Sequence, residues 1–320
     1  MPRFYIKHLT KYTYSDFVID GANQIKLYPI EDAYQQVINQ TIKVTNQPII
    51  ETFKDFYNNT VGSFMVIVPH NFLSISSEVE VETSEQIFPE DSAPAEEQWK
   101  VLKVLKKDPE YMDFLKYKTF DGTPEILDMI ASKDLNNISP YKIALEFCEF
   151  IYKNFEYKSG ITTVDSKLDL VWKLKAGVCQ DFTNILLQMV RMLGIPARYV
   201  SGYICPSDDN VRGEGATHAW IEVYIPFYGW LGIDPTNNAI ANQYHVKLAT
   251  GRDYKDCSPV KGVYKGNVQD DLFVKVKVST VKNNNENLVF PVNEKDNISN
   301  SFRKNQEILQ QMQQQQQQQQ

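Results

Sequence analysis

Long apolar runs are missing from this sequence. No stretch approaches the roughly 18 consecutive apolar residues that a membrane-spanning helix needs, so none is expected. The first residues, Met1 to Ser15, alternate in polarity and lack the apolar segment of a secretory signal peptide. We therefore expect a cytoplasmic protein that has no membrane partner.

The sequence also lacks closely spaced cysteine pairs. Its four cysteines are Cys148, Cys179, Cys205 and Cys257, and no C-x-x-C motif occurs among them. This spacing argues against a zinc finger or a disulfide framework, and free thiols suit a reducing compartment. A metal site built from Cys179, Cys205 and His218 has no support from ligand spacing. Because no phosphate-binding G-x-x-x-x-G-K-[ST] motif occurs either, the sequence predicts neither a metal nor a cofactor.

The sequence also has no excess of basic over acidic residues. The formal net charge is -7, so a nucleic acid is not an expected partner. Residues 78–98 contain acidic side chains but no Lys or Arg, a pattern that is usual for a solvated linker. We predict an acidic linker at residues 85–108. The length of 320 residues suggests two domains, and a hydrophobic content of 42% can fill two cores.

Alternating segments rich in aromatic and β-branched residues fill the N-terminal part. The segments are FYIKHLTKYTYS, QVINQTIKVTN, NTVGSFMVIVPH and FLSISSEVEVET. Turn signals separate them, for example at residues 57–59 and 69–71. These patterns predict a small antiparallel β domain at residues 1–84.

Helical patterns follow after Pro109 and precede a second group of strand patterns. Ser139 and Pro140 are suited to cap and begin a helix, and the residues from Val178 to Leu193 form another, with Gly194 as its stop. The strand patterns ARYVSGYI, THAWIEVYIP and WLGIDPT come next. We predict an α+β domain at residues 109–280, with helices packed on an antiparallel sheet.

The C-terminal part is of low complexity. Residues 281–320 are rich in Asn and Gln and end in a glutamine run. Such a composition cannot bury enough apolar surface to offset chain entropy, so we predict a disordered tail.

Cys179 stands out among the four thiols because it lies at the start of the helix predicted after Val178. Free N–H groups and the helix dipole stabilise a thiolate at such a position. Cys179 is three residues before Phe182 and therefore shares the apolar face of the helix. Cys148, in contrast, lies beside the apolar stripe of its helix and is interpreted as a core thiol.

His218 and Asp234 occupy matching positions in a predicted hairpin. Alternation places His218 on the face opposite Ile221 and places Asp234 on the face opposite Ile233. Counted from the turn at residues 226–229, the two residues fall almost directly opposite each other. An aspartate in that position can hold an imidazole in one orientation, as a cysteine nucleophile requires of its base.

Four motifs then carry a resemblance to a known family. GVCQDF, GIPARYVSGY, HAWIEVY and GWLGIDPTN resemble, in this order, the bacterial-type transglutaminase-like family. YIKHLTKYTYS, IKLYPI and VPHNFLSISSEVEVE are similar to the β domain that precedes this core, and GRDYKDCSPVKGVYKG to its end. The likeness covers about residues 1–278 and implies a papain-like, transglutaminase-like core after the β domain.

The resemblance implies a catalytic triad of the nucleophile Cys179, the base His218 and the orienting residue Asp234. A thiol enzyme that acts on peptide or protein amides through a Cys179 thioester is expected. We favour a hydrolase, a cysteine protease or amidase, because water is the default acceptor. A protein-glutamine transglutaminase is the first alternative, and a scaffold without catalysis on the same fold is the second.

Other residues have weaker signals. The backbone N–H of Cys179 is one candidate oxyanion donor, and Tyr157 and Trp172 are candidates for a second. His8 is interpreted as a structural or surface residue, and His245 has no evident partner. Oligomeric state cannot be inferred from these patterns.

Overall fold

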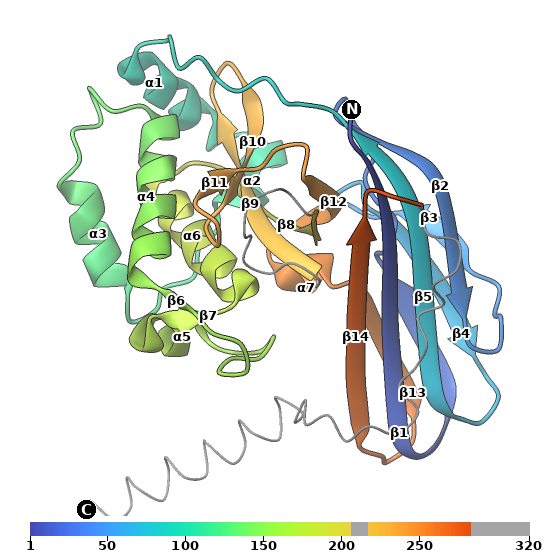
Figure 1. The fold of residues 1–320 in the computed structure, drawn as a ribbon. Coiled ribbons are helices and arrows are strands. Elements are labelled where there is room, and N and C mark those ends of the chain that lie inside the picture. Colours follow the sequence, from blue (N-terminus) through green and yellow to red (C-terminus); the bar gives the residue numbers. More distant parts are fainter. Residues whose placement is uncertain (206–216, 283–320) are drawn as a thin grey trace, which may run out of the picture.

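Three layers follow one another across the molecule (Figure 1). A layer of helices covers one face of a five-stranded sheet, and a separate β domain lies on the other side of that sheet. The computed structural model describes residues 1–205 and 217–282. The predicted tail therefore lies outside the described residues from residue 283 onwards. The α+β prediction is confirmed.

The β domain is built around one long strand. Its first five strands are β1 (Arg3–Ile25), β2 (Gln35–Val44), β3 (Glu51–Lys54), β4 (Thr60–Val66) and β5 (His70–Thr83). The first part of β1 pairs antiparallel with β5, and its last residues pair antiparallel with β4. The register shifts between Thr13 and Val18, so β1 bends there and serves both halves of the sheet. The predicted antiparallel character is confirmed.

Two strands from the far end of the chain complete this sheet. β13 (Val260–Lys265) and β14 (Asp270–Ser279) both pair antiparallel with β1. The sequence patterns assign these residues to the α+β domain at 109–280. In the structure they belong to the sheet of the β domain, so the α+β domain ends before β13. The physical reason is that each half of β1 has two edges, and one edge of each would otherwise carry unpaired backbone groups.

The predicted acidic linker is partly helical. Residues 95–105 form α1 (Ala95–Leu105), whose first turn carries Glu96 and Glu97. Trp99 and Leu102 are buried against the helical layer, so the acidic residues line only the outer face of an amphipathic helix. The structure therefore shortens the predicted linker of residues 85–108 to the segment before α1.

The helical layer contains the two helices that the sequence pattern predicts. Its other elements are α2 (Pro109–Met112), η1 (Asp113–Leu115), α3 (Thr123–Ala131), α5 (Leu168–Leu174) and the short paired strands β6 (Glu156–Tyr157) and β7 (Ala176–Gly177). In α4 (Pro140–Asn154) the Ser139 hydroxyl accepts a hydrogen bond from the Lys142 N–H. The helix α6 (Cys179–Leu193) stops at Gly194, which has a φ of 83°.

The central sheet has the strand order β11-β10-β9-β8-β12. Its strands are β8 (Ala197–Ile204), β9 (Thr217–Ile225), β10 (Gly229–Asp234), β11 (Ala239–Ile240) and β12 (His245–Gly251), followed by the short helix α7 (Tyr254–Cys257). Phe182 and Ile185 of α6 share one apolar core with Ile221 and Ile233 of the sheet. Burial of each such side chain contributes roughly 1.5–3 kcal/mol.

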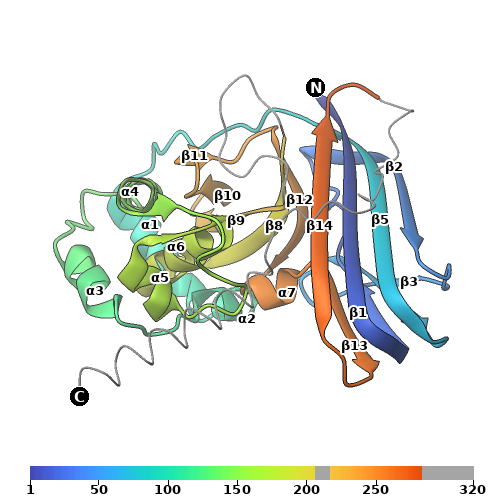
Figure 2. The same ribbon diagram turned by 60° about the horizontal axis from the view of Figure 1, so that its bottom comes forward.

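The β domain packs on the edge of the central sheet formed by β8 and β12 (Figure 2). Tyr203 and Cys205 contribute to the β-domain core, together with Val246 and Leu248 of β12. Lys247 lies between these two residues of β12, and its backbone carbonyl accepts a hydrogen bond from the Ile30 N–H at 3.0 Å. The two parts of the molecule therefore share one apolar core and backbone hydrogen bonds.

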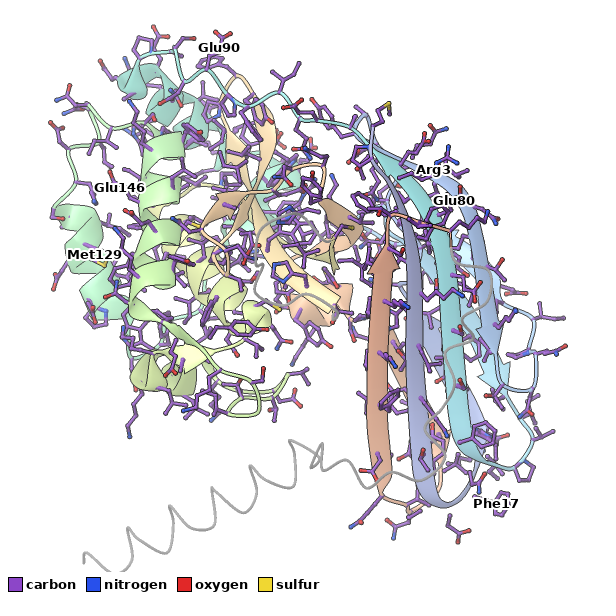
Figure 3. The ribbon with its side chains drawn as sticks, in the orientation of Figure 1. Arg3, Phe17, Glu80, Glu90, Met129 and Glu146 are labelled. Atoms are coloured by element: carbon purple, nitrogen blue, oxygen red, sulfur yellow. The ribbon has the colours of Figure 1, made fainter. Side chains whose placement is uncertain are left out.

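The two ends of the β domain carry different exposed side chains. Arg3 of β1 is paired with Glu80 of β5 at 2.9 Å, near the loop that leads towards α1 (Figure 3). Phe17 lies at the opposite end and is 62% exposed. Among the described residues, no helix is both long and apolar enough to cross a membrane.

Candidate active site

Cys179 is the first residue of α6, and a buried carboxylate supports this helix start. Asp181 accepts hydrogen bonds from the Val178 N–H at 2.8 Å and the Thr162 hydroxyl at 2.6 Å. Burial raises the pKa of Asp181, although these two hydrogen bonds lower it. A Cβ atom at Gly177 would lie 2.5 Å from the Asp181 carboxylate, so only glycine fits there. The role of Asp181 was not evident from the sequence.

His218 and Asp234 form a direct contact. Nε2 of His218 lies 2.8 Å from Oδ2 of Asp234, and both side chains are fully buried. The hairpin pairs Ile221 with Ile233 and Tyr224 with Trp230, so His218 and Asp234 are diagonal neighbours rather than directly opposite. The sequence pattern thus predicted the shared face and came within one diagonal step of the register.

Asp234 is a hydrogen-bond acceptor for several groups. Besides His218, its Oδ2 atom lies 2.8 Å from the Asn237 amide nitrogen and 3.4 Å from Nε2 of His245. Its Oδ1 atom accepts the Thr236 backbone N–H at 2.8 Å. A buried carboxylate with this many donors stays ionised.

The electrostatics of the pair follow from these contacts. Burial would lower the pKa of His218, but the charge and hydrogen bond of Asp234 and the nearby Cys179 raise it to about 10. Burial would raise the pKa of Asp234, but His218 and His245 hold it well below its ordinary value. The pair therefore favours an imidazolium beside a carboxylate.

The second ring nitrogen of His218 faces the thiol. Nδ1 has no hydrogen-bond partner among the described residues, and Cys179 is near enough to raise the pKa of the imidazole. Sγ of Cys179 lies 4.0 Å from the carbonyl oxygen of Thr217, the residue before His218. The structure therefore brings the three predicted site residues together.

The other three thiols are buried in apolar surroundings. Burial raises the pKa of Cys148, and the Asp234 charge adds to this effect. Burial likewise raises the pKa values of Cys205 and Cys257. The Cys148 thiol donates to the Asp234 carbonyl oxygen at 3.4 Å, so it packs behind the site and matches its predicted core position. Among the described residues, no histidine affects the pKa of these three thiols, whereas His218 interacts with Cys179.

The two candidates for a second oxyanion donor separate in the structure. Burial raises the pKa of Tyr157 to about 12, and the nearby Cys179 adds to this, so its hydroxyl keeps its proton close to the thiol. Trp172 instead packs against Phe120 and Phe155 in the helical layer. Tyr157 therefore remains a candidate, and the contacts of Trp172 are those of a core residue.

One group of side chains also has the spacing of a metal site. The ligand atoms of His218, Asp234 and His245 all lie within 4.8 Å of one another. The hydrogen bonds from Asn237 and Thr236 already occupy lone pairs of the Asp234 carboxylate. A metal ion would have to displace the contact between His218 and Asp234, so the donor set fits a hydrogen-bonded cluster better.

Comparisons with known proteins concern the family of the chain. The model of the transglutaminase-like superfamily matches residues 130–235, and that of the bacterial transglutaminase-like N-terminal region matches residues 4–82. An uncharacterised protein of Mycobacterium leprae (strain TN) is 30% identical over 283 residues, which are 87% of this chain and 99% of that protein.

Two further comparisons concern named activities. The protein-glutamine gamma-glutamyltransferase of Pseudomonas aeruginosa is 32% identical over 94 residues, 27% of this chain and 14% of that protein. A crystal structure from Cytophaga hutchinsonii, provisionally described as a cysteine protease, has a TM-score of 0.68. It is 22% identical, and the match covers 87% of this chain and 90% of that one, which shows a common fold. The chain belongs to the transglutaminase-like superfamily.

Proposed function

We propose that this protein is a thiol enzyme that cleaves peptide or protein amides through a thioester at Cys179. The observation that supports this most is the position of His218. One of its ring nitrogens contacts the buried Asp234 carboxylate, and the other faces the Cys179 thiol. This is the relation between nucleophile, base and orienting group that covalent catalysis requires.

The first half of the reaction forms the thioester. The Cys179 sulfur attacks the amide carbonyl carbon after its proton has passed to His218, which is held by Asp234. The tetrahedral intermediate collapses, the C–N bond breaks, and the His218 imidazolium gives its proton to the departing amine. The acyl group remains on Cys179, and His218 is neutral again.

The second half releases the acyl group. Water loses a proton to His218 and adds to the thioester carbonyl, and the C–S bond then breaks to free a carboxylic acid and Cys179. The N–H groups at the start of α6 lie where they can stabilise the oxyanion in both halves. The Tyr157 hydroxyl, which stays protonated, is suited to be a second donor.

Amine transfer is the second candidate. A primary amine in place of water would convert the same thioester into a new amide, and the named relative of Pseudomonas aeruginosa is a glutamyltransferase. That similarity covers only part of this chain, so it supports the shared thioester chemistry more than the acceptor. We favour hydrolysis because water is always present at high concentration.

Thiol reactivity tests the nucleophile first. The whole protein is alkylated by iodoacetamide at pH 6–7 and the modified peptides are mapped. We expect Cys179 to react about tenfold faster than any other cysteine, because the imidazolium of His218 stabilises its thiolate. Cys205→Ala is the matched control and should leave labelling unchanged, whereas Cys179→Ala should abolish the fast phase. Faster labelling of Cys205 or Cys257 would disprove this assignment.

A peptide library with and without an added primary amine separates the two reactions. Free carboxylic acids in both samples support hydrolysis, and new amides only with the amine support transfer. If neither product forms while Cys179 labels no faster than the other thiols, the protein is a scaffold on this fold.

A further inference from the structure

His245 is a second buried histidine at the Asp234 carboxylate. It is 8% exposed, and its Nε2 atom lies 3.4 Å from Oδ2 of Asp234, the same oxygen that contacts His218. The edge of its ring meets Trp220 at a centroid distance of 5.2 Å and an angle of 77°. His245 is therefore held in place beside the proposed site, with Nε2 towards Asp234.

The donor and acceptor roles of the two ring nitrogens of His245 follow from their contacts. Nδ1 lies 3.2 Å from the backbone nitrogen of Asn242, and a backbone N–H can only donate. The side-chain oxygen of Asn242 lies 3.3 Å from Nδ1 and accepts the Tyr244 N–H. Because the Asn242 N–H donates to Nδ1, a ring proton lies on Nε2, and Nε2 donates it to the carboxylate of Asp234.

The strand that carries His245 is fixed on one face and along its backbone edge. On one face of β12, Val246 and Leu248 belong to the β-domain core. The backbone of Lys247 is bonded on both sides to the Gln35 side chain, its N–H at 2.8 Å and its carbonyl at 2.9 Å. His245 points the other way, towards Asp234. The β domain therefore holds in register the strand that presents this imidazole.

We propose that His245 is a positioning residue that donates a hydrogen bond to Asp234 and thereby fixes the carboxylate that orients His218. This inference rests on the proposed thiol chemistry and deepens it. Asp234 is the last residue of β10 and pairs with Ala239 of β11, one residue beyond the pairing with β9. With Asn237, His245 contacts Oδ2 from a different element than His218 does, so that the carboxylate cannot rotate away from the base.

Two substitutions separate positioning from packing. His245→Phe keeps the ring shape but removes the hydrogen-bond donor. It should slow alkylation of Cys179 by iodoacetamide at pH 7 about tenfold, which is less than the loss of a general acid–base residue itself would cause. His245→Gln can place an N–H near the position of Nε2 and should restore the rate to within about twofold of wild type. A packing role alone would not be rescued in this way.

His8→Phe is the matched control. His8 is also a buried histidine, 1% exposed, but its partners are Tyr203 and Thr10. This variant should lower the melting temperature and leave the alkylation rate of Cys179 unchanged. Wild-type rates in His245→Phe, or a folded His245→Gln that reacts as slowly as the Phe variant, would overturn the inference.

A measurement on the wild-type protein does not depend on the folding of any variant. Nitrogen-15 NMR of labelled histidine should show His245 as the neutral tautomer with its proton on Nε2, and a proton on Nδ1 would refute the proposal. The inference fails alone if Cys179 is fast and slowed by Asp234→Asn but indifferent to His245. If Cys179 is no faster than the other thiols, the proposed function itself fails.

Discussion

Two buried histidines of this protein have opposite acid–base behaviour. His8 lies in the β domain and contacts the Tyr203 hydroxyl at 2.8 Å and the Thr10 hydroxyl at 3.0 Å. Burial lowers the pKa of His8 to about 4. Burial would do the same to His218, but the Asp234 carboxylate reverses the shift and raises the pKa to about 10.

The comparison shows which neighbour matters. Both rings are about 1% exposed, so the lack of water cannot explain the difference. Hydroxyl partners satisfy the ring nitrogens of His8 without favouring its charge, whereas a carboxylate stabilises the imidazolium of His218. A buried histidine thus becomes a candidate base through one anionic neighbour.

The largest expected effect comes from removing that neighbour. Asp234→Asn keeps the shape of the side chain and removes its charge, so the imidazolium loses its main support. We expect alkylation of Cys179 by iodoacetamide at pH 7 to fall by about 100-fold or more. Stopped-time alkylation with mass spectrometry measures the rate. A fall of less than about threefold would mean that the Asp234 charge does not control the thiol.

The reverse change adds a carboxylate to the other histidine. In Thr10→Asp, an acid of similar size replaces the hydroxyl that contacts Nε2 of His8. We expect the pKa of His8 to rise from about 4 to above 6.5, because an ion pair offsets the burial. NMR titration of the imidazole resonances measures it, with Thr13→Asp on the same strand as the control. A pKa that stays near 4 would contradict the comparison.

The two histidines should also affect stability in opposite pH ranges. Between pH 6.5 and about 4, His8 is protonated in the unfolded chain but not in the folded protein. Its contribution therefore makes the free energy of unfolding decrease as the pH falls through this range. Folded His218 retains a proton, so its contribution is complete below pH 6.5 and is lost as pH rises to about 10.

Urea unfolding of His8→Gln and His218→Gln at pH 4.5, 6.5 and 9.5 separates these contributions. Relative to wild type, His8→Gln should lose less stability towards acid and His218→Gln less towards base. Each full range corresponds to roughly 3–5 kcal/mol. Parallel pH profiles for the wild type and both variants would show that neither shift exists.

The smallest expected effect on stability comes from removing a hydrogen-bond partner of His8. Tyr203→Phe removes the hydroxyl that contacts Nδ1 of His8 and should cost about 1 kcal/mol of the free energy of unfolding. The alkylation rate of Cys179 should not change, since Tyr203 belongs to the β-domain core. A slower thiol in this variant would mean that the two histidines are coupled across the shared core.

Local patterns in the sequence were enough to predict much of the site. The cap at Ser139, the stop at Gly194 and the alternation around His218 depend on neighbouring residues, and each appears in the structure as expected. The contact of Asp234 with His245 was missed because it joins strands that are not adjacent in the sheet. Alternation along β12 could have suggested it, since Val246 and Leu248 turn His245 to the opposite face.

The domain boundaries were harder for a related reason. The pairing of β13 and β14 with β1 connects residues from opposite ends of the described chain, and no local pattern reports such a distance. The acidic residues before Gln98 favoured the prediction of a linker over that of a helix. Charged residues indicate solvent exposure, but they do not distinguish a linker from the exposed face of a helix. Trp99 and Leu102 were the signal that could have revealed it.

The pairing of β1 with β14 sets an order for biosynthesis. Tyr5 leaves the ribosome long before its partner Ser279, which emerges only after the whole central sheet has been made. The β domain must therefore wait with one edge of β1 open, while the helices and β8 to β12 can already fold. We infer that closure of this strand pair is the slow, late step of folding, and that a nascent chain stalled before Asp270 exposes an edge prone to wrong pairing.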